Sequence, residues 1–439
     1  MQLKKGQSIR GALATATCTL LGTATDDAAA FGTDAPWEFD SALLLYSETD
    51  RVEAIEPVFK ARKELDDDEF INLRLVFDSL TGASASGAVP MPFPQTFTQP
   101  SGKNAYTADP NEPVLDPSFL DSRVALSGEW EVPHSRLLKG VYGAYFSNEY
   151  DYTSLGASAT LARDNADKSR TYTAGLSVSF DTVEPVGGAP VGMTLMPEFP
   201  DVKAIQSTSE DKTVVDFLFG VTQILDQRSL IQLNYSIGNS DGYLTDPYKI
   251  LSVIDDNPLS ADYGEIINQN TGDGPSYRYE NRPDTRLSQS LYTKYVHQFD
   301  KDVIYFSYRY FWDDWGIDSH TFDVRYRYEL GGGHYLQPHV RQYIQSAADF
   351  YKPYLLASDE PNVTSATEAS ADYRLGDMTT TTIGLLYGLE FSKTSEFTTR
   401  LEFMKQSGDE PDKFGELNNQ ELFPDVDVVI FQVGYSFTF

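Results

Sequence analysis

Strict alternation between apolar and polar side chains is the feature that most constrains how this chain can fold. In the C-terminal stretch, one face collects the apolar residues Val429, Phe431, Val433, Tyr435, Phe437 and Phe439. The opposite face collects Gln432, Gly434, Ser436 and Thr438. A period of two residues is typical of a β-strand that has one apolar and one polar face. The chain therefore ends in an amphipathic strand, and its last residue is an aromatic one on the apolar face.

The same alternation recurs along the chain. Phe322, Val324, Tyr326, Tyr328 and Leu330 alternate with Asp323, Arg325, Arg327 and Glu329. Ile383, Leu385, Tyr387, Leu389 and Phe391 alternate with Gly384, Gly388 and Glu390. A soluble β-sandwich also alternates, but its strands are shorter. Many strands here span about 10 to 15 residues, near the length with which a tilted strand crosses a bilayer.

Turn-forming segments between the strands fall into two classes. Seven short turns are expected at Asp66–Asp68, Pro133–Ser135, Asp164–Lys168, Asp226–Gln227, Asp300–Asp302, Gly331–His334 and Ser392–Ser395. Eight further connections lie between them: five long ones at 80–120, 182–211, 239–283, 347–376 and 408–425, and three short ones at Glu48–Asp50, Asn148–Tyr150 and Trp315–Asp318. Fifteen connections join 16 strands, and an even count places both termini on the periplasmic side. The sequence thus predicts an all-β fold, a single transmembrane antiparallel β-barrel of about 16 strands with long extracellular loops and short periplasmic turns.

The N-terminal segment has the layout of a secretory signal peptide. Lys4, Lys5 and Arg10 precede an uncharged stretch that ends near the small residues 28–30. We therefore expect a signal peptide over 1–30 and one barrel domain over 31–439. A disordered N-terminus of a cytosolic protein is the alternative. Cys18 is the one cysteine of the chain, so a cleaved signal would leave a mature protein without thiol chemistry.

The net charge of −31 excludes nucleic acid as a partner, because phosphate binding requires a basic surface. The five long predicted loops hold 27 Asp and Glu against 8 Lys and Arg, which is −19 of that total. The acidity therefore belongs mainly to the outer mouth, where it can attract cations or bridge to lipopolysaccharide through divalent ions.

Charged side chains on the polar face are predicted to line the lumen. They are Arg62, Arg74, Arg123, Glu129, Arg309, Asp323, Arg325, Arg327, Glu329, His339, Arg341, Arg400 and Glu402. Arginines facing carboxylates in a wet lumen can filter ions and small solutes. The structural alternative is that these groups pair with one another and stabilise or fill the barrel.

Metal binding and catalysis have little support in the sequence. Asp313, Asp314 and Asp318 cluster in one outer loop, where carboxylates suit Ca²⁺, but the spacing of an EF-hand is missing. Solvated acidic loops are the simpler interpretation, so no cofactor is expected apart from loop-bound Ca²⁺. Only His339 among the five histidines has the inward parity, and no Gly-x-Ser-x-Gly elbow occurs. We therefore expect a protein that is not an enzyme.

Aromatic residues gather at the short-turn ends of the strands on the apolar face. They are Tyr295, Phe299, Tyr328, Phe391, Phe397, Tyr435, Phe437 and Phe439. Amphipathic rings favour the headgroup level of a bilayer, so this set predicts an interfacial girdle.

Several motifs resemble those of a bacterial family known as Domain of Unknown Function family 3570. They are Tyr46–Arg51, Asp78–Pro90, Glu149–Gly156, Val183–Pro190, Asn239–Lys249 and Trp312–Asp318. The resemblance implies a Gram-negative outer-membrane protein whose genes neighbour those of a flavin transferase, a thioredoxin-like protein and a small lipoprotein. The aromatic ending also resembles the C-terminal signal of outer-membrane barrels, so Tyr435, Phe437 and Phe439 are expected to be recognised by the barrel insertion machinery.

Two functions follow as hypotheses. The first is a porin-like channel or conduit with an acidic outer mouth and a lumen of mixed charge. The second is a non-conducting barrel that serves as a scaffold or a secretion or assembly partner for a lipoprotein, a secreted polypeptide or a redox carrier. The uncharged, Pro/Gly-rich stretch from Ser79 to Gly102 is a candidate for an inward-folded plug.

Overall fold

The computed structural model describes residues 36–66, 68–267 and 276–439. The predicted signal peptide at 1–30 lies outside the described residues. Within the described ranges, no helix is long and apolar enough to cross a membrane.

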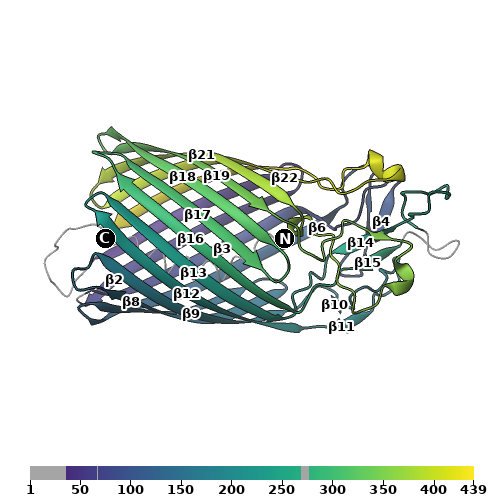
Figure 1. Ribbon diagram of the computed structural model, residues 1–439, viewed down its shortest axis with the longest axis horizontal. Helices are drawn as coiled ribbons and strands as arrows, with labels where there is room; N and C mark the ends of the chain where they lie inside the picture. The colour runs from purple at the N-terminus through teal and green to yellow at the C-terminus, as the bar shows by residue number, and fades with distance from the viewer. Residues whose placement is uncertain (1–35, 67, 268–275) are drawn as a thin grey trace.

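Sixteen antiparallel strands form one closed barrel, in which each strand pairs with its neighbours along the chain (Figure 1). In barrel order they are β1 (Trp37–Glu48), β2 (Val52–Asp66), β3 (Glu69–Ala85), β6 (Leu115–Ser135), β7 (Leu138–Asn148), β8 (Tyr152–Asp164), β9 (Arg170–Val183), β12 (Glu210–Asp226), β13 (Ser229–Gly242), β16 (Thr285–Gln298), β17 (Val303–Asp313), β18 (Asp318–Gly331), β19 (His334–Gln345), β21 (Met378–Ser392), β22 (Ser395–Gly408) and β23 (Val426–Thr438). β1 and β23 close the ring, and Trp37 and Phe439 exchange backbone hydrogen bonds of 2.8 Å at the seam. Closure leaves no free strand edge, which is what a bilayer requires of a β-structure.

The predicted count of 16 strands and the division into short turns and long loops are confirmed. The short turns lie at one end of the barrel and the five long loops at the other (Figure 1). The strand lengths differ from the prediction at three places, because β3 and β12 have 17 residues and β6 has 21. The sequence predicts loops at the outer ends of these strands, whereas in the structure β3 extends to Ala85 and β6 begins at Leu115.

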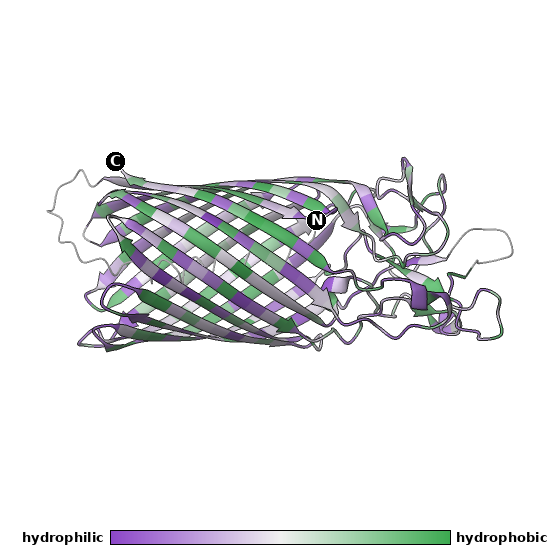
Figure 2. Ribbon diagram, turned by 90° about the horizontal axis from the view of Figure 1, so that it is seen from above, coloured by the Kyte–Doolittle hydropathy of each residue, from purple (hydrophilic) through white to green (hydrophobic). Residues whose placement is uncertain are grey.

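The two faces of the wall separate by parity, as the alternation requires. Large apolar side chains such as Phe219, Phe322 and Ile383 are exposed on the outward face, whereas the residues between them point into the barrel. The colours of Figure 2 alternate accordingly along the barrel strands. Exposed apolar bands of this extent are stable when lipid covers them.

Aromatic girdles lie near both ends of the outward face. At the short-turn end, Phe39 stacks on Phe437 with ring centroids 5.2 Å apart, and Tyr435 stacks on Phe437 at 5.6 Å. Near the loop end, Tyr310 stacks on Trp312 at 5.1 Å. The predicted girdle at the short-turn end is therefore matched by a second one near the outer end, as expected for a bilayer with two interfaces.

The long loops fold together into a compact unit beyond the outer end of the barrel, which we call the loop head. It contains the strands β4 (Gln95–Thr98) with β5 (Ala105–Ala108), β10 (Ala189–Pro190) with β11 (Ile205–Ser207), and a three-stranded sheet of β15 (Tyr277–Tyr279), β14 (Ile250–Ile254) and β20 (Leu355–Leu356). Short 3-10 helices occur at Glu360–Asn362, Tyr373–Leu375 and Gly415–Asn419. β14 joins two different loops, because it pairs with β15 of its own loop and in parallel with β20 of another.

A hydrophobic core holds the loop head together. Phe97 stacks on Tyr106 at 5.3 Å and contacts Tyr277 at 4.8 Å, and Leu417 of a fourth segment is fully buried in the same cluster. Figure 1 places β4 with β14 and β15 beyond the end of the barrel. The expectation that the stretch beginning at Ser79 plugs the lumen is therefore wrong for its β4 segment. Its apolar residues bury against other loops instead of against the charged inner wall.

Candidate functional site

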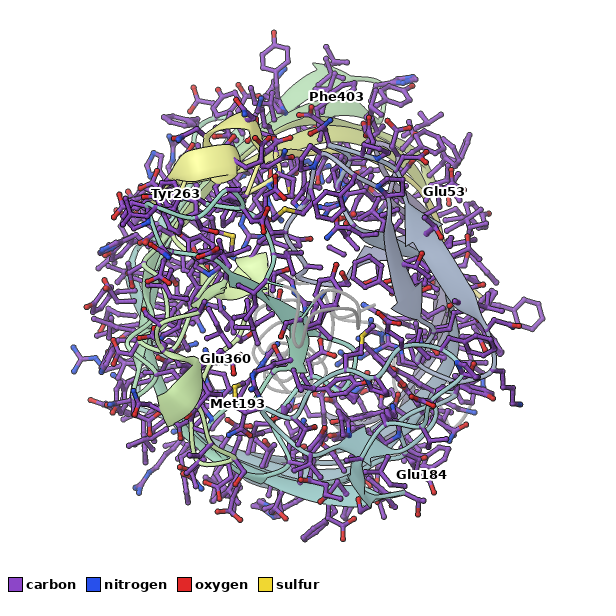
Figure 3. All side chains as sticks on the ribbon, turned by 90° about the vertical axis from the view of Figure 1, so that its right-hand side faces the viewer. Glu53, Glu184, Met193, Tyr263, Glu360 and Phe403 are labelled. Atoms are coloured by element: carbon purple, nitrogen blue, oxygen red, sulfur yellow. The ribbon has the colours of Figure 1, made fainter. Side chains whose placement is uncertain are left out.

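The inner wall of the barrel is the first candidate site. All thirteen predicted lumen residues lie on barrel strands with the parity opposite to the exposed apolar residues. Viewed from the loop side (Figure 3), Phe403 points away from the ring, whereas Met193 and Glu360 of the loop head lie inside its outline. The loop head thus overhangs the mouth of the barrel, and a solute would meet the head before it reaches the inner wall.

His339 is held between two carboxylates on the inner wall. Its Nε2 lies 2.8 Å from Oδ2 of Asp323, and its Nδ1 lies 2.8 Å from Oε1 of Glu402. Because carboxylates only accept hydrogen bonds, this arrangement suits the protonated ring. Arg325 is 3.2 Å from Asp323, and Arg400 is 3.7 Å from Glu402. Both ring nitrogens are occupied, so His339 has none left to activate a serine.

A second charged cluster lies nearer the short-turn end. Glu131 is almost fully buried; it pairs with Arg62 at 3.5 Å and with Lys139. The guanidinium of Arg62 lies 4.1 Å above the ring of Phe70. Arg327 forms a third cluster with Glu329 at 2.5 Å and Glu390 at 2.7 Å.

Among the remaining predicted lumen residues, Glu129 adjoins the cluster of Glu131 and Arg62, whereas Arg123, Arg309 and Arg341 lie elsewhere. Arg123 pairs with Asp78 at 3.0 Å. Glu129 lies near Arg74. Arg309 and Arg341 lie close to one another on strands β17 and β19. Much of the wall charge is therefore neutralised locally, which agrees with the structural alternative for most of these residues and leaves the last two as exceptions.

Part of the inner wall is rich in short uncharged polar side chains, which a search for charged residues did not single out. Strands β8, β9, β13 and β16 turn short hydroxyl and amide side chains inward: Ser154, Ser158, Thr160, Thr173, Ser177, Ser179, Gln232, Asn234, Ser236 and Ser290. Ser236 and Ser290 share a hydrogen bond of 2.7 Å across two strands. The same parity that identified the charged residues could have identified these. The lumen wall therefore combines ion pairs with a region rich in hydroxyl and amide groups, in which Lys212 still pairs with Asp181 at 3.3 Å.

A buried network of ion pairs connects two long loops within the loop head. Arg282 donates to Glu280 at 2.7 Å and to Asp372 at 2.9 Å, which connects two long loops. Arg374 also pairs with Asp372, and Ser370 donates to Glu280. Burial raises the pKa of Glu280 to about 7, against the opposing effect of Arg282. Burial alone would raise the pKa of Asp372 as well, but the neighbouring Arg374 outweighs it and holds that pKa well below its usual range.

Lys249 completes this network. It is buried, it donates to the backbone carbonyl of Ala85, and burial lowers the pKa of its ammonium group. The contact links the head to the outer end of β3. No sequence pattern indicates this network, because it joins two long loops whose paired residues, such as Arg282 and Asp372, lie 90 residues apart.

The three aspartates predicted as weak metal ligands have protein partners instead. Asp313 pairs with Arg286 at 2.8 Å and accepts backbone hydrogen bonds from Trp315 and Ile317. Asp314 accepts from the backbone of Leu287 at 2.9 Å, and Asp318 accepts from a serine hydroxyl at 3.1 Å. Over the described part of the chain, no group of three or more acidic, histidine or cysteine side chains is arranged to hold a metal ion. Bound Ca²⁺ stays a prediction without structural support.

No curated protein matches the chain. Among solved structures, a bacterial polysaccharide outer membrane secretin has a TM-score of 0.42 at 8% identity, covering 93% of this chain and 100% of that one. The CymD monoaromatic hydrocarbon channel has a TM-score of 0.40 at 9% identity, with 92% and 89% covered. OccK2 (OpdF) of Pseudomonas aeruginosa, solved with glucuronate, has a TM-score of 0.38 at 9% identity, with 93% and 100% covered. At such low identities and TM-scores, the likeness concerns the fold alone.

A family model gives the longest match. Residues 10–437 match the family described as Protein of unknown function (DUF3570). The match spans all sixteen barrel strands and the whole loop head, apart from the last residue of β23.

Proposed function

Since the chain belongs to the DUF3570 family and forms a closed barrel of the bacterial outer membrane, we propose that it is a porin-like channel for small solutes, with the loop head as its outer vestibule. The observation that carries this proposal is the contrast between the two faces of one wall. Apolar side chains cover the outside, and ion pairs together with hydroxyl groups line the inside. A barrel of 16 strands is wide enough to hold an aqueous path.

The charge of the loop head supports a cation-attracting mouth. Net negative charge around an opening raises the local concentration of cations and lowers that of anions, and salt screens the effect. The head also overhangs the mouth (Figure 3), so its charge acts on a solute before entry. We expect selectivity for K⁺ over Cl⁻ at low salt that fades as salt is added.

Planar-bilayer recording of the purified full-length protein tests this proposal. A channel gives discrete conductance steps, and a reversal potential under a KCl gradient reports the selectivity. Neutralising two exposed acids of the head, as in Asp201→Asn with Asp262→Asn, should lower the cation preference. The matched control neutralises two exposed acids of the short turns, Asp167→Asn with Asp300→Asn, which leaves the outer mouth unchanged. A correctly folded barrel that never conducts would refute the channel.

A second proposal, a barrel that holds a protein partner, is favoured by one specific observation. The loop between β9 and β12 exposes the apolar residues Leu195, Phe199, Val202 and Ile205 on the loop head. Exposed apolar clusters often mark contact surfaces. The candidate partners are a small lipoprotein and a secreted or redox polypeptide. Affinity purification at native levels should recover a stoichiometric partner from the wild type and lose it with Phe199→Ser and Val202→Ser. Recovery of the barrel alone would count against a partner.

Lipid, lipopolysaccharide and the barrel insertion machinery are proposed partners of any protein with this surface. Support comes from the lipid-facing girdles and from the position of Phe439, which is 87% exposed at the barrel seam. A divalent bridge between the acidic head and lipopolysaccharide would appear as a release of lipopolysaccharide from the purified protein when a chelator is added.

A further inference from the structure

Three inward arginines of the described residues, Arg74, Arg309 and Arg341, form no ion pair with a carboxylate, and the last two lie near each other. Six inward arginines each form an ion pair: Arg62, Arg123, Arg286, Arg325, Arg327 and Arg400. Within the described part of the chain, neither Arg309 nor Arg341 has an ion pair or a hydrogen bond from its guanidinium. The sequence cannot make this distinction, because all nine residues share the inward parity.

The strand register brings Arg309 and Arg341 together. Arg309 on β17 lies opposite Thr321 on β18, and Arg341 on β19 lies opposite Asp323, which is the next inward residue of β18. The two guanidiniums are close enough for their charges to repel. An aromatic ring lies beside one of the two arginines, since the guanidinium of Arg309 is 5.6 Å from the ring centroid of Tyr292.

The nearest carboxylate is already engaged. Asp323 accepts from His339 at 2.8 Å and pairs with Arg325 at 3.2 Å, so Arg341 attracts it only at longer range. The side chain of Arg341 is exposed to the lumen. Two neighbouring like charges disfavour each other, and an anion placed between them reduces that cost. A guanidinium also presents a planar fork of donors that matches a carboxylate or phosphate group.

We propose that Arg309 and Arg341 form an oxyanion site that binds the carboxylate or phosphate group of a small solute passing through the barrel. This proposal rests on the channel function proposed above and names its substrate class. The acidic head lowers the concentration of anions at the mouth, but this effect does not reach the arginine pair, because charges in wet surroundings are screened beyond about 8 Å at physiological salt. The head sets what enters the mouth, and the arginine pair sets what binds deeper in the lumen.

Binding and conductance test the proposal separately. Isothermal titration of the detergent-solubilised full-length protein uses succinate and inorganic phosphate as probes, and needs no conduction. Arg309→Gln with Arg341→Gln should weaken binding by roughly ten-fold or more, the scale of hydrogen bonds to charged groups. The matched control, Arg327→Gln with Arg400→Gln, also removes two inward charges, but these side chains already have carboxylate partners. In bilayers, the first pair of changes should also shift the reversal potential toward greater cation preference and relieve block by the better-binding probe.

Each outcome has a separate meaning. Probe binding that is lost only in the Arg309/Arg341 variant supports the site, even if the barrel never conducts and the channel proposal fails. Absence of binding in the wild type, or equal weakening in both variants, overturns the site and leaves conduction to be judged on its own. Preference between succinate and phosphate then distinguishes a carboxylate from a phosphate ligand. Far-ultraviolet circular dichroism and the gel shift on heating confirm that each variant is folded.

Discussion

Oε1 of Glu402 lies 2.8 Å from Nδ1 of His339, although the whole of strand β21 separates the strands that carry them. The register shows how this is possible. His339 lies opposite Gly384 on β21, and Gly384 lies opposite Glu402 on β22. A glycine at the crossing point leaves the space through which the glutamate side chain reaches over the intervening strand.

A larger side chain at position 384 should break the contact between His339 and Glu402. In Gly384→Val, the new Cβ would lie 2.5 Å from Cγ of Glu402. We expect the free energy of unfolding to fall by about 1–3 kcal/mol, as overpacked sites do. Urea titration followed by tryptophan fluorescence measures this. The control is Gly128→Val, whose Cβ would meet only Leu73, at 3.5 Å. Equal losses in the two variants would contradict a specific role for Gly384.

Removing the central arginine of the head network should loosen the head without opening the barrel. Arg282→Ala leaves Glu280 and Asp372 as buried carboxylates with less compensation, a change that typically costs about 3–5 kcal/mol. The control is Arg228→Ala, because the pair with Asp300 is solvent-exposed and should contribute less than about 1 kcal/mol. Limited proteolysis followed by mass spectrometry reports cleavage within the loops. Equal resistance of both variants would show that the network is dispensable.

Stability of the head should depend on pH through Glu280. Burial raises its pKa to about 7, so the folded head retains a proton that the unfolded chain has released. The stabilisation that Glu280 contributes is therefore complete below about pH 4.5 and is lost as pH rises from about 4.5 to about 7, by an amount on the order of 3 kcal/mol. The low pKa of Asp372 places its own titration below this window.

Amide hydrogen exchange at pH 5.5 and 7.5, corrected for intrinsic rates, measures this dependence. Protection in β14 and β15 should be greater at the lower pH. Glu280→Gln keeps the shape of the side chain but cannot titrate, so its profile should be flat over the same interval. If wild type and variant showed the same slope, another group would be responsible.

The terminal aromatic residue should matter for assembly more than for stability. The side chain of Phe439 is 87% exposed, whereas Phe437 stacks on Phe39. We expect Phe439→Ala to reduce the amount of barrel in the outer membrane of cells and to change the unfolding free energy of the refolded protein by less than about 0.5 kcal/mol. Phe437→Ala should lower both. Normal assembly of the Phe439 variant would rule out a role in recognition by the insertion machinery.

Much of the barrel is predictable because alternation is a local property. The polar residues between Phe322 and Leu330 had to face one side together, and closure of the sheet made that side the lumen. Turn-forming segments then gave the strand number. The boundaries were less certain, since the first residues of β6 do not alternate as the rest of the strand does, and their strand conformation depends on pairing with β3.

Which charged side chains pair with one another on the inner wall was less predictable from the sequence than which side chains face inward. Arg309 and Arg325 have the same parity and the same side chain, yet only Arg325 has a carboxylate within reach. The clustering of Asp313, Asp314 and Asp318 in one loop suggested a weak metal site, but Arg286, backbone N–H groups and a serine hydroxyl contact these carboxylates. Which atoms meet depends on register across several strands, and a single sequence does not display that register.

Alternation and turn spacing in the sequence alone determined an outer-membrane barrel of 16 strands with a polar lumen and acidic loops. Tertiary structure alone decided how the loops combine, as when β14 pairs in parallel with β20, about 100 residues away. Tertiary structure also decided which charged groups are buried, as at Glu280, and which inward arginines are left without an ion pair. The physical reason is that a strand's two faces follow from neighbouring residues, whereas burial and ion pairing arise from contacts between segments that are distant in the chain.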